Sequence, residues 1–252
     1  ETVRRLGVGA GLLGFLGEAL TVLAGAVIRP WRLRGASFVH HCQEAGFNAP
    51  PIVSLMGFLI GVVLAFQGAV QLRQFGAEVF VVDLIAISIL RELGILLTAI
   101  IVAGRSSSAF TAAIGSMKMR EEIDAMRILG LDPVSILVVP RILALVITLP
   151  ILGFIAAISG LVGGALMAWI ELGVSPGMFR VRLLEAVDYW QFLIGIIKAP
   201  FFALTIGLIG CYQGLQVEGN TESLGRLTSR SVVLSIFFVI VLDAVFSVFF
   251  AY

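Results

Sequence analysis

Several uninterrupted apolar stretches, each about as long as a bilayer is thick, constrain this chain more than any other feature. They cover roughly residues 51–72, 80–103, 134–170, 191–215 and 232–251. A helix needs about 20 apolar residues to cross the hydrocarbon core of a membrane. Within lipid the backbone must satisfy its own hydrogen bonds, which a continuous apolar run does as a helix. The sequence therefore predicts an all-α integral membrane protein with five transmembrane helices.

Composition and missing motifs narrow the function classes. Of the 252 residues, 59% are hydrophobic and 13% are charged, whereas soluble proteins carry about 25% charged residues. Neither lysine, Lys118 or Lys198, follows a glycine, so no GxxxxGK[ST] phosphate-binding loop exists. Cys42 and Cys211 lie far apart without metal-site spacing. We expect neither an enzyme nor a metal site, and no cofactor in this chain.

Residues 6–28 are apolar apart from Glu18 and admit two interpretations. The segment is either a sixth span or a helix that lies in the membrane interface. A sixth span would move Arg4 and Arg5 away from the side that holds most other cations, so charge favours the interfacial helix. Residues 1–49 are therefore predicted to form an N-terminal interfacial region, and residues 50–252 a single five-helix membrane domain.

Lysines and arginines outside the spans predict the orientation of the chain. With five spans, one side carries twelve of them: Arg4, Arg5, Arg29, Arg32, Arg34, Arg105, Lys118, Arg120, Arg127, Arg141, Arg226 and Arg230. The other side carries three: Arg73, Arg180 and Arg182. Because loops rich in positive charge stay in the cytoplasm, we expect a cytoplasmic N-terminus and an external C-terminus.

A charged segment at about 117–130 separates the second and third apolar runs. Four of its apolar residues share one face at helical spacing: Met119, Ile123, Met126 and Leu129. Gly130 and the Asp132-Pro133 step would end such a helix. It is either a solvated connector or a short coupling helix that docks on a soluble cytoplasmic subunit. The apolar stripe favours docking, since a solvated helix needs none.

Four ionisable residues of the predicted spans fall at similar depth from the outer surface: Arg91, Glu92, Lys198 and Asp243. Such groups are costly in lipid and face a bundle interior or a wet cavity. Arg91 and Glu92 point about 100° apart on an α-helix, so we expect Glu92 to pair with Lys198 and Arg91 with Asp243. The network either pins helices together or borders a cavity that recognises a polar headgroup, and the two roles are compatible.

Small residues and one apolar stripe mark further helix faces. Three glycine pairs have the GxxxG spacing: Gly57 and Gly61, Gly160 and Gly164, and Gly210 and Gly214. Packing within the chain is the simpler interpretation of these pairs. A stripe on the first span comprises Leu64, Gly68, Gln71, Leu72 and Phe75. It either lines an apolar cavity or makes ordinary core and lipid contacts.

With these features in place, the chain resembles the MlaE/YrbE permeases of bacterial ABC-type lipid transporters over roughly residues 48–252. Five segments carry the resemblance: Gly61–Gly68 (GVVLAFQG), Leu90–Gly94 (LRELG), Ala103–Ala109 (AGRSSSA), Glu122–Met126 (EIDAM) and Gly225–Val233 (GRLTSRSVV). Each segment alone is weak, but together they are specific.

The resemblance implies a homodimeric permease in the bacterial inner membrane, with five spans and an N-terminal interfacial helix per subunit. It implies a cytoplasmic ABC-type ATPase that binds ATP and magnesium, a STAS-domain protein and a periplasmic hexamer of MCE-domain proteins as partners. The expected cargo is phospholipid, moved between the inner and outer membranes to maintain outer-membrane lipid asymmetry. No nucleic acid is expected as a partner.

The resemblance also assigns roles to residues of this chain. The lipid-binding residues would be Leu64, Gln71, Leu72, Phe75 and Leu93. The intramembrane polar cluster near the lipid would be Arg91, Glu92, Lys198 and Asp243. ATPase coupling would fall to Arg120, Glu121, Glu122, Ile123, Asp124, Ala125, Met126 and Arg127. Two rival functions are a membrane scaffold that anchors soluble partners and an ion-coupled carrier with a proton site at Glu92 or Asp243.

Overall fold

The computed structural model describes residues 14–23, 25 and 35–250. In this part of the chain nearly every residue is helical, and five helical stretches are long and apolar enough to cross a membrane. These candidate spans are Gly35–Arg73, Val81–Met119, Val134–Leu172, Tyr189–Leu215 and Thr221–Phe249. The prediction of an all-α chain with five membrane-spanning helices is confirmed.

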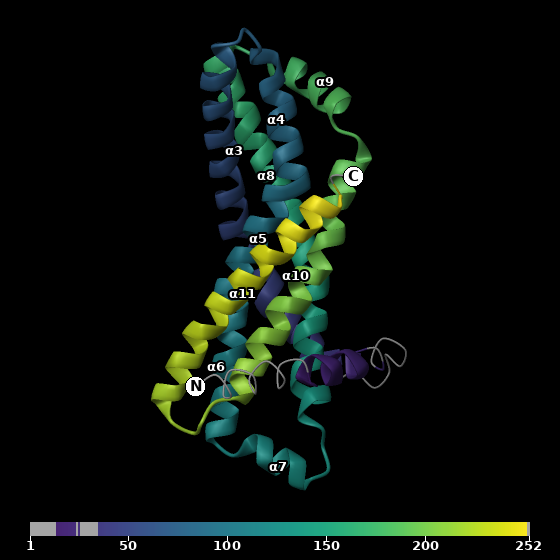
Figure 1. The fold of residues 1–252 in the computed structure, drawn as a ribbon, viewed down its shortest axis with the longest axis vertical. Coiled ribbons are helices and arrows are strands. Elements are labelled where there is room, and N and C mark those ends of the chain that lie inside the picture. Colours follow the sequence, from purple (N-terminus) through teal and green to yellow (C-terminus); the bar gives the residue numbers. More distant parts are fainter. Residues whose placement is uncertain (1–13, 24, 26–34, 251–252) are drawn as a thin grey trace. The chain divides into compact units, whose positions relative to one another are not determined.

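The elements follow one another along the chain with short connections (Figure 1). The first two spans comprise α2 (Gly35–Cys42), η2 (Gln43–Phe47), α3 (Pro50–Arg73), η3 (Glu78–Phe80), α4 (Val81–Ile87), η4 (Ser88–Leu93), α5 (Gly94–Val102), η5 (Ala103–Ser107) and α6 (Ser108–Met119). The remainder comprises α7 (Glu122–Ile128), η6 (Val134–Val138), α8 (Val139–Leu172), α9 (Pro176–Ala186), α10 (Tyr189–Leu215) and α11 (Thr221–Phe249). Of the η elements, η3 is a 3₁₀ turn and the others are π-helical.

Two helices extend well beyond the apolar runs that predicted them. The second span continues past residue 103 to Met119, and the fifth begins at Thr221 rather than near residue 232. Hydropathy marks where a helix meets lipid, whereas a helix ends where its backbone hydrogen bonds end. Polar helical turns outside the hydrocarbon are therefore missed when apolar runs alone are counted.

The chain divides into two compact units, each built from three segments. The first contains residues 1–45, 102–147 and 203–238, and the second contains 46–101, 148–202 and 239–252. The long helices α8, α10 and α11 contribute residues to both units. The units are described separately below.

In the second unit, α3 and α8 touch backbone to backbone. A methyl group added at Gly61 would lie 1.9 Å from the carbonyl oxygen of Gly160, and one at Gly163 would lie 2.2 Å from that of Phe58. Such an approach is possible only where neither helix carries a side chain. The interpretation of these glycines as packing residues within the chain is confirmed.

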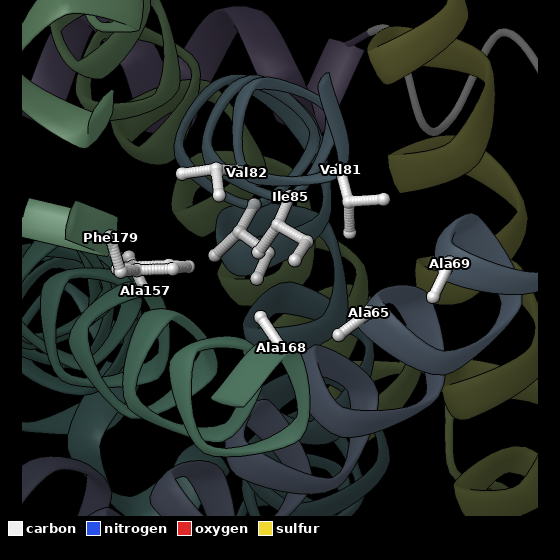
Figure 2. Packing of buried hydrophobic residues seen from close by; sticks show 9 residues of the cluster. Ala65, Ala69, Val81, Val82, Ile85, Ala157, Ala168 and Phe179 are labelled. Atoms are coloured by element: carbon white, nitrogen blue, oxygen red, sulfur yellow. The ribbon is translucent and has the colours of Figure 1, made fainter. Parts of the chain in front are cut away.

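The core of the second unit is an apolar cluster around α4. Figure 2 shows its members converging from α3, α4, α8 and α9, and they are Ala65, Ala69, Val81, Val82, Ile85, Ile89, Ala157, Ala168 and Phe179. Phe179 is the contribution of α9, which lies beside α4 (Figure 1). The small alanines let the helices approach, and the β-branched residues of α4 fill the space between them.

In the first unit, hydroxyl groups join η5 and α6 to α10 and α11. The hydroxyls of Ser107 and Ser235 lie 3.0 Å apart, and Thr111 donates to the carbonyl of Gly210 at 2.9 Å. Gly210 sits against Ser107, where an added methyl group would lie 3.0 Å from the serine backbone. Small and hydroxyl-bearing residues thus replace large apolar ones at this helix contact.

The N-terminal prediction falls largely outside the described residues. Residues 1–13, 24 and 26–34 are not described, whereas Gly14–Leu23 forms a short apolar helix. The choice between a sixth span and an interfacial helix for residues 6–28 therefore stays a prediction, as does the interfacial region 1–49.

Candidate functional site

The predicted intramembrane charges meet in the second unit around Lys198. No part of the Lys198 side chain is exposed, and its ammonium group donates to Glu92 Oε2, to Asp243 Oδ1 at 3.0 Å and to Ser247 Oγ at 3.2 Å. An ammonium group has three donors, and all three are used. Lys198 is therefore fully satisfied without water or lipid.

Three helical stretches supply these groups. Glu92 lies in the π-helical turn η4, Lys198 in α10 two residues before Pro200, and Asp243 in α11. Ser247 lies one helical turn after Asp243, on the same face, and donates to Glu92 Oε2 at 2.8 Å. It was not predicted, although its i+4 spacing from Asp243 was a usable signal.

The pairing of Glu92 with Lys198 is confirmed, but the pairing of Arg91 with Asp243 is wrong. Asp243 bonds to Lys198, and Arg91 pairs with its neighbour Glu92, with Nε 3.3 Å from Oε1. Arg91 also donates to the carbonyl of Phe250 at 3.2 Å. Consecutive side chains diverge less in a π-helical turn, which has more residues per turn than an α-helix, so these two long side chains can meet.

The cluster is electrically neutral and has an inner and an outer part. Its two cations and two carboxylates balance, which lowers the cost of placing them at membrane depth. Lys198 is 0% and Asp243 12% exposed, whereas the Arg91 and Glu92 side chains are 23% and 26% exposed. Arg91 and Glu92 are therefore the charged residues of the cluster that are most accessible to a ligand in this conformation, while Lys198 and Ser247 hold Glu92 in place.

Neither of the two hollows of the second unit is lined by any of the five predicted lipid-binding residues, and their role as lipid contacts stays a prediction. Leu64 and Leu72 pack against the α4 core. Gln71 is exposed, Phe75 lies beyond the end of α3 and is 79% exposed, and Leu93 in η4 is partly buried. Both α4 and α8 pack against α3, so residues along the predicted stripe differ in exposure.

Two hollows of the second unit involve other residues. A small hollow of about 10 Å³ lies among η4, α5, α8 and α10, bordered by Leu90, Pro150 and Gly195. An open groove of about 580 Å³ runs between α3 and α8, lined by Pro51, Ser54, Leu55, Phe58, Ile158, Ser159 and Val162. The apolar runs of the sequence predicted that these helix surfaces are hydrophobic, but only the contacts between helices determine where a hollow remains.

The charged helix predicted over 117–130 is not one rod. α6 ends at Met119, and Glu121 has the left-handed φ of 59°, which cannot continue a right-handed helix. The helix restarts as α7 over Glu122–Ile128. The break separates Met119 from the rest of the predicted apolar stripe. Within the rest, Ile123 is 2% exposed, whereas Leu129, just after the end of α7, is 74% exposed.

The predicted coupling residues differ in what they can touch. Five of them are exposed: Arg120, Glu121, Asp124, Ala125 and Arg127. Glu122 and Met126 are partly buried, and Ile123 anchors α7 to its own chain. Ile128, 86% exposed, was not among the predicted site residues, and with Leu129 it forms an apolar tip beside the Asp124–Arg127 ion pair.

Comparisons with known proteins place this geometry in a family. The model of the family Permease MlaE matches residues 38–249, which include all the cluster residues and α7. Over 231 residues the chain is 36% identical to the intermembrane phospholipid transport system permease protein MlaE of Haemophilus influenzae, covering 90% of this chain and 88% of that protein.

Other relatives come from another bacterium and from a plant. A probable ABC transporter permease protein of Rickettsia typhi is 34% identical over 190 residues, which are 75% of this chain and 73% of that protein. The chloroplastic protein TRIGALACTOSYLDIACYLGLYCEROL 1 of Arabidopsis thaliana is 27% identical over 93% of this chain and 68% of its own length. The family match and the Haemophilus relative together establish that this chain belongs to the MlaE permease family.

Proposed function

We propose that this chain is the permease subunit of an ATP-driven transporter that moves phospholipid between the inner and outer membranes of a bacterium. The observation that carries the proposal is the family match over residues 38–249. It is supported by the 36% identity to a permease named for intermembrane phospholipid transport. Maintenance of outer-membrane lipid asymmetry would be the consequence.

The proposal includes an assembly around the permease. Two copies of the chain form a homodimer in the inner membrane, with N-termini in the cytoplasm and C-termini in the periplasm. A cytoplasmic ABC-type ATPase binds ATP and magnesium, and a STAS-domain protein accompanies it. A periplasmic MCE-domain hexamer exchanges the lipid with the permease. Residues 1–49 lie in the interface, and residues 50–252 form the permease domain.

The charge cluster has a specific part in this mechanism. Arg91 is partly exposed and its guanidinium presents planar, paired donors that suit a phosphate group. Glu92, held by Lys198 and Ser247, keeps the Arg91 side chain in place. A phospholipid headgroup would meet this polar rim while its acyl chains follow apolar helix surfaces that include Leu64, Leu72, Phe75 and Leu93, with Gln71 beside them.

In the proposal, the α7 segment couples the permease to its ATPase. The exposed charges of Arg120, Asp124 and Arg127 would give orientation, and the partly buried Glu122 and Met126 would move with the rest of the chain. Because Ile123 is packed into its own chain, a displacement of α7 by the ATPase would be passed to α6 and η6 on either side. No ATP binds to this chain in the proposal.

Reconstitution tests the function directly. Vesicles that contain the permease with its ATPase and MCE partners are expected to move labelled phospholipid to acceptor vesicles when ATP is present. Vesicles with a non-hydrolysable nucleotide serve as the control. A scaffold would give no ATP-dependent movement, and an ion-coupled carrier would respond to a pH gradient without the ATPase. Either result would refute the proposal.

A further inference from the structure

A second group of buried cationic side chains lies in the first unit, apart from the charge cluster. Arg141 of α8 is only 4% exposed. Its Nη1 donates to the carbonyl of Leu137 at 2.8 Å, and its guanidinium carbon lies 5.7 Å from the ring centre of Phe110. Its Nε is buried and has no hydrogen-bond partner among the described residues.

Two more side chains with unused buried atoms belong to this region, His41 beside the same Phe110 ring and Arg105 on the backbone of Glu44. His41 of α2 lies edge-on to Phe110, with ring centres 6.0 Å apart, and Arg105 of η5 donates through Nη2 to the carbonyl of Glu44 at 3.1 Å. In the described part of the chain, neither His41 Nδ1 nor Arg105 Nη1 has a hydrogen-bond partner. His41, Arg105 and Arg141 are called the basic cluster below.

The basic cluster is short of negative charge. The carboxylate of Glu44 lies 3.8 Å from His41 Nδ1, which is beyond hydrogen-bond reach. No carboxylate of the described residues forms an ion pair with Arg105 or Arg141. A buried guanidinium without an anionic partner is strongly destabilising. The three basic side chains come from separate helical stretches, α2, η5 and α8. An anion that accepts from these donors would remove the cost.

The depth of the cluster suggests which anion. Arg141 lies seven residues after the start of the third span at Val134, which is about 10 Å along a helix. This is the depth at which headgroups meet acyl chains. Arginine forks match the oxygen geometry of phosphate, the anion that a phospholipid carries at this level.

We propose that the basic cluster is a phosphate-binding site of the first unit. Its ligand is a phosphate group, either the phosphodiester of a phospholipid or a free phosphate ion. Arg105 and Arg141 donate to the phosphate oxygens, and His41 donates through Nδ1 when its proton resides there. The inference goes beyond the proposed function, because binding at this site requires neither ATPase nor transport.

Native mass spectrometry of the full chain in detergent tests the site with three probes. Dihexanoyl phosphatidylglycerol carries acyl chains and a phosphodiester, inorganic phosphate carries only the anion, and dihexanoylglycerol carries only the acyl chains. We expect one bound equivalent that requires phosphate. Displacement of the lipid by inorganic phosphate identifies a general phosphate site, whereas retention of the lipid identifies a phospholipid site. Binding of dihexanoylglycerol with equal affinity would overturn the proposal.

Variants assign the bound equivalent to the cluster. Arg141→Gln is expected to weaken that equivalent about tenfold to a hundredfold, the range for a lost hydrogen bond to a charged group. Its unfolding temperature without phosphate is expected to stay equal or rise, because a buried unpaired charge is removed. Arg105→Gln, at a partly exposed position, tests the same site if Arg141→Gln does not fold.

The control is Arg230→Gln, an exposed arginine of the same unit. It is expected to bind all probes as the parent does. If Arg105→Gln and every folded Arg141 variant retain parental phosphate affinity, the cluster has a purely structural role and the proposal is wrong. Failure of lipid transport in reconstituted vesicles would leave this binding result unaffected.

Discussion

At the scale of single residues, the cluster around Lys198 is held together by the hydrogen bonds that all three donors of its ammonium group make. Its three donors reach Glu92, Asp243 and Ser247, and none of the side chain is exposed. Removal of the cation would leave two carboxylates facing each other in a poorly solvated place. That cost greatly exceeds the net worth of the original pairs, because an unpaired buried charge has no compensation.

Lys198→Met is therefore expected to lower the free energy of unfolding by about 3–5 kcal/mol. Denaturant titration of the purified chain in detergent measures this change. Adding Glu92→Gln to Lys198→Met should recover part of the loss, since Arg91 and Asp243 then balance in charge. An unfolding transition of Lys198→Met at the parental denaturant concentration would show that the cluster is not a coupled network.

At the scale of elements, backbone contact between α3 and α8 organises the second unit. Gly61 and Gly160 leave no room for a side chain between the two helices. The π-helical turns matter equally, because η4 carries Arg91 and Glu92 while η5 carries Arg105. A π-helical turn redirects the side chains around it and is often found at functional sites. Both proposed sites of this chain use one.

Gly61→Ala is expected to destabilise the chain by about 1–3 kcal/mol or more, the range for overpacking a tight interior. The added methyl group meets a backbone oxygen at 1.9 Å, and backbone cannot rotate away as a side chain can. Thermal unfolding in detergent measures the effect. The matched control is Gly225→Ala in α11, where no atom lies within 4 Å, and it should change stability by at most about 1 kcal/mol. Equal effects of the two changes would contradict the backbone contact.

At the scale of the whole molecule, charge placement and the exposed α7 segment determine how the chain meets its surroundings. In the predicted topology, most cations outside the spans fall on the side that holds α7, which is the proposed cytoplasmic side. α7 presents Asp124 and Arg127, with side chains 61% and 64% exposed, to a soluble partner. Charges on a docking surface control orientation and the rate of association.

Glu122→Lys combined with Asp124→Lys is expected to weaken association with the ATPase by about tenfold, while membrane insertion stays intact. Co-purification of the ATPase with tagged permease measures association, and membrane fractionation measures insertion. The same reversal at Glu218, in the connection between α10 and α11, and at Glu222, in the first turn of α11, provides the control. Unchanged co-purification after the α7 exchange would argue that docking occurs elsewhere.

Features of the site that depend on one segment of the chain could be predicted from the sequence. Most features that depend on contacts between distant helices could not. The pairing of Glu92 with Lys198 was predicted correctly, because opposite charges at similar depth in the membrane lower each other's cost of burial. Arg91 was misassigned because the π-helical turn at residues 88–93 changes the angle between neighbours, and hydropathy does not report helix type. The exposure of each residue of the α3 stripe was not predicted, because the orientation of the helices that pack against α3, namely α4 and α8, was unknown.

The amino-acid sequence alone determined the all-α membrane class, the five spans and the resemblance to the family, because apolar runs and short motifs are properties of local stretches. Only the tertiary structure decided which carboxylates surround Lys198, where α7 breaks away from α6, and that His41 and Arg141 meet around Phe110. These outcomes depend on how each helix is rotated about its axis and on which distant segment packs against it. Neither quantity is encoded in the hydropathy of a single helix, since an apolar surface is compatible with many rotations until neighbouring side chains exclude all but one.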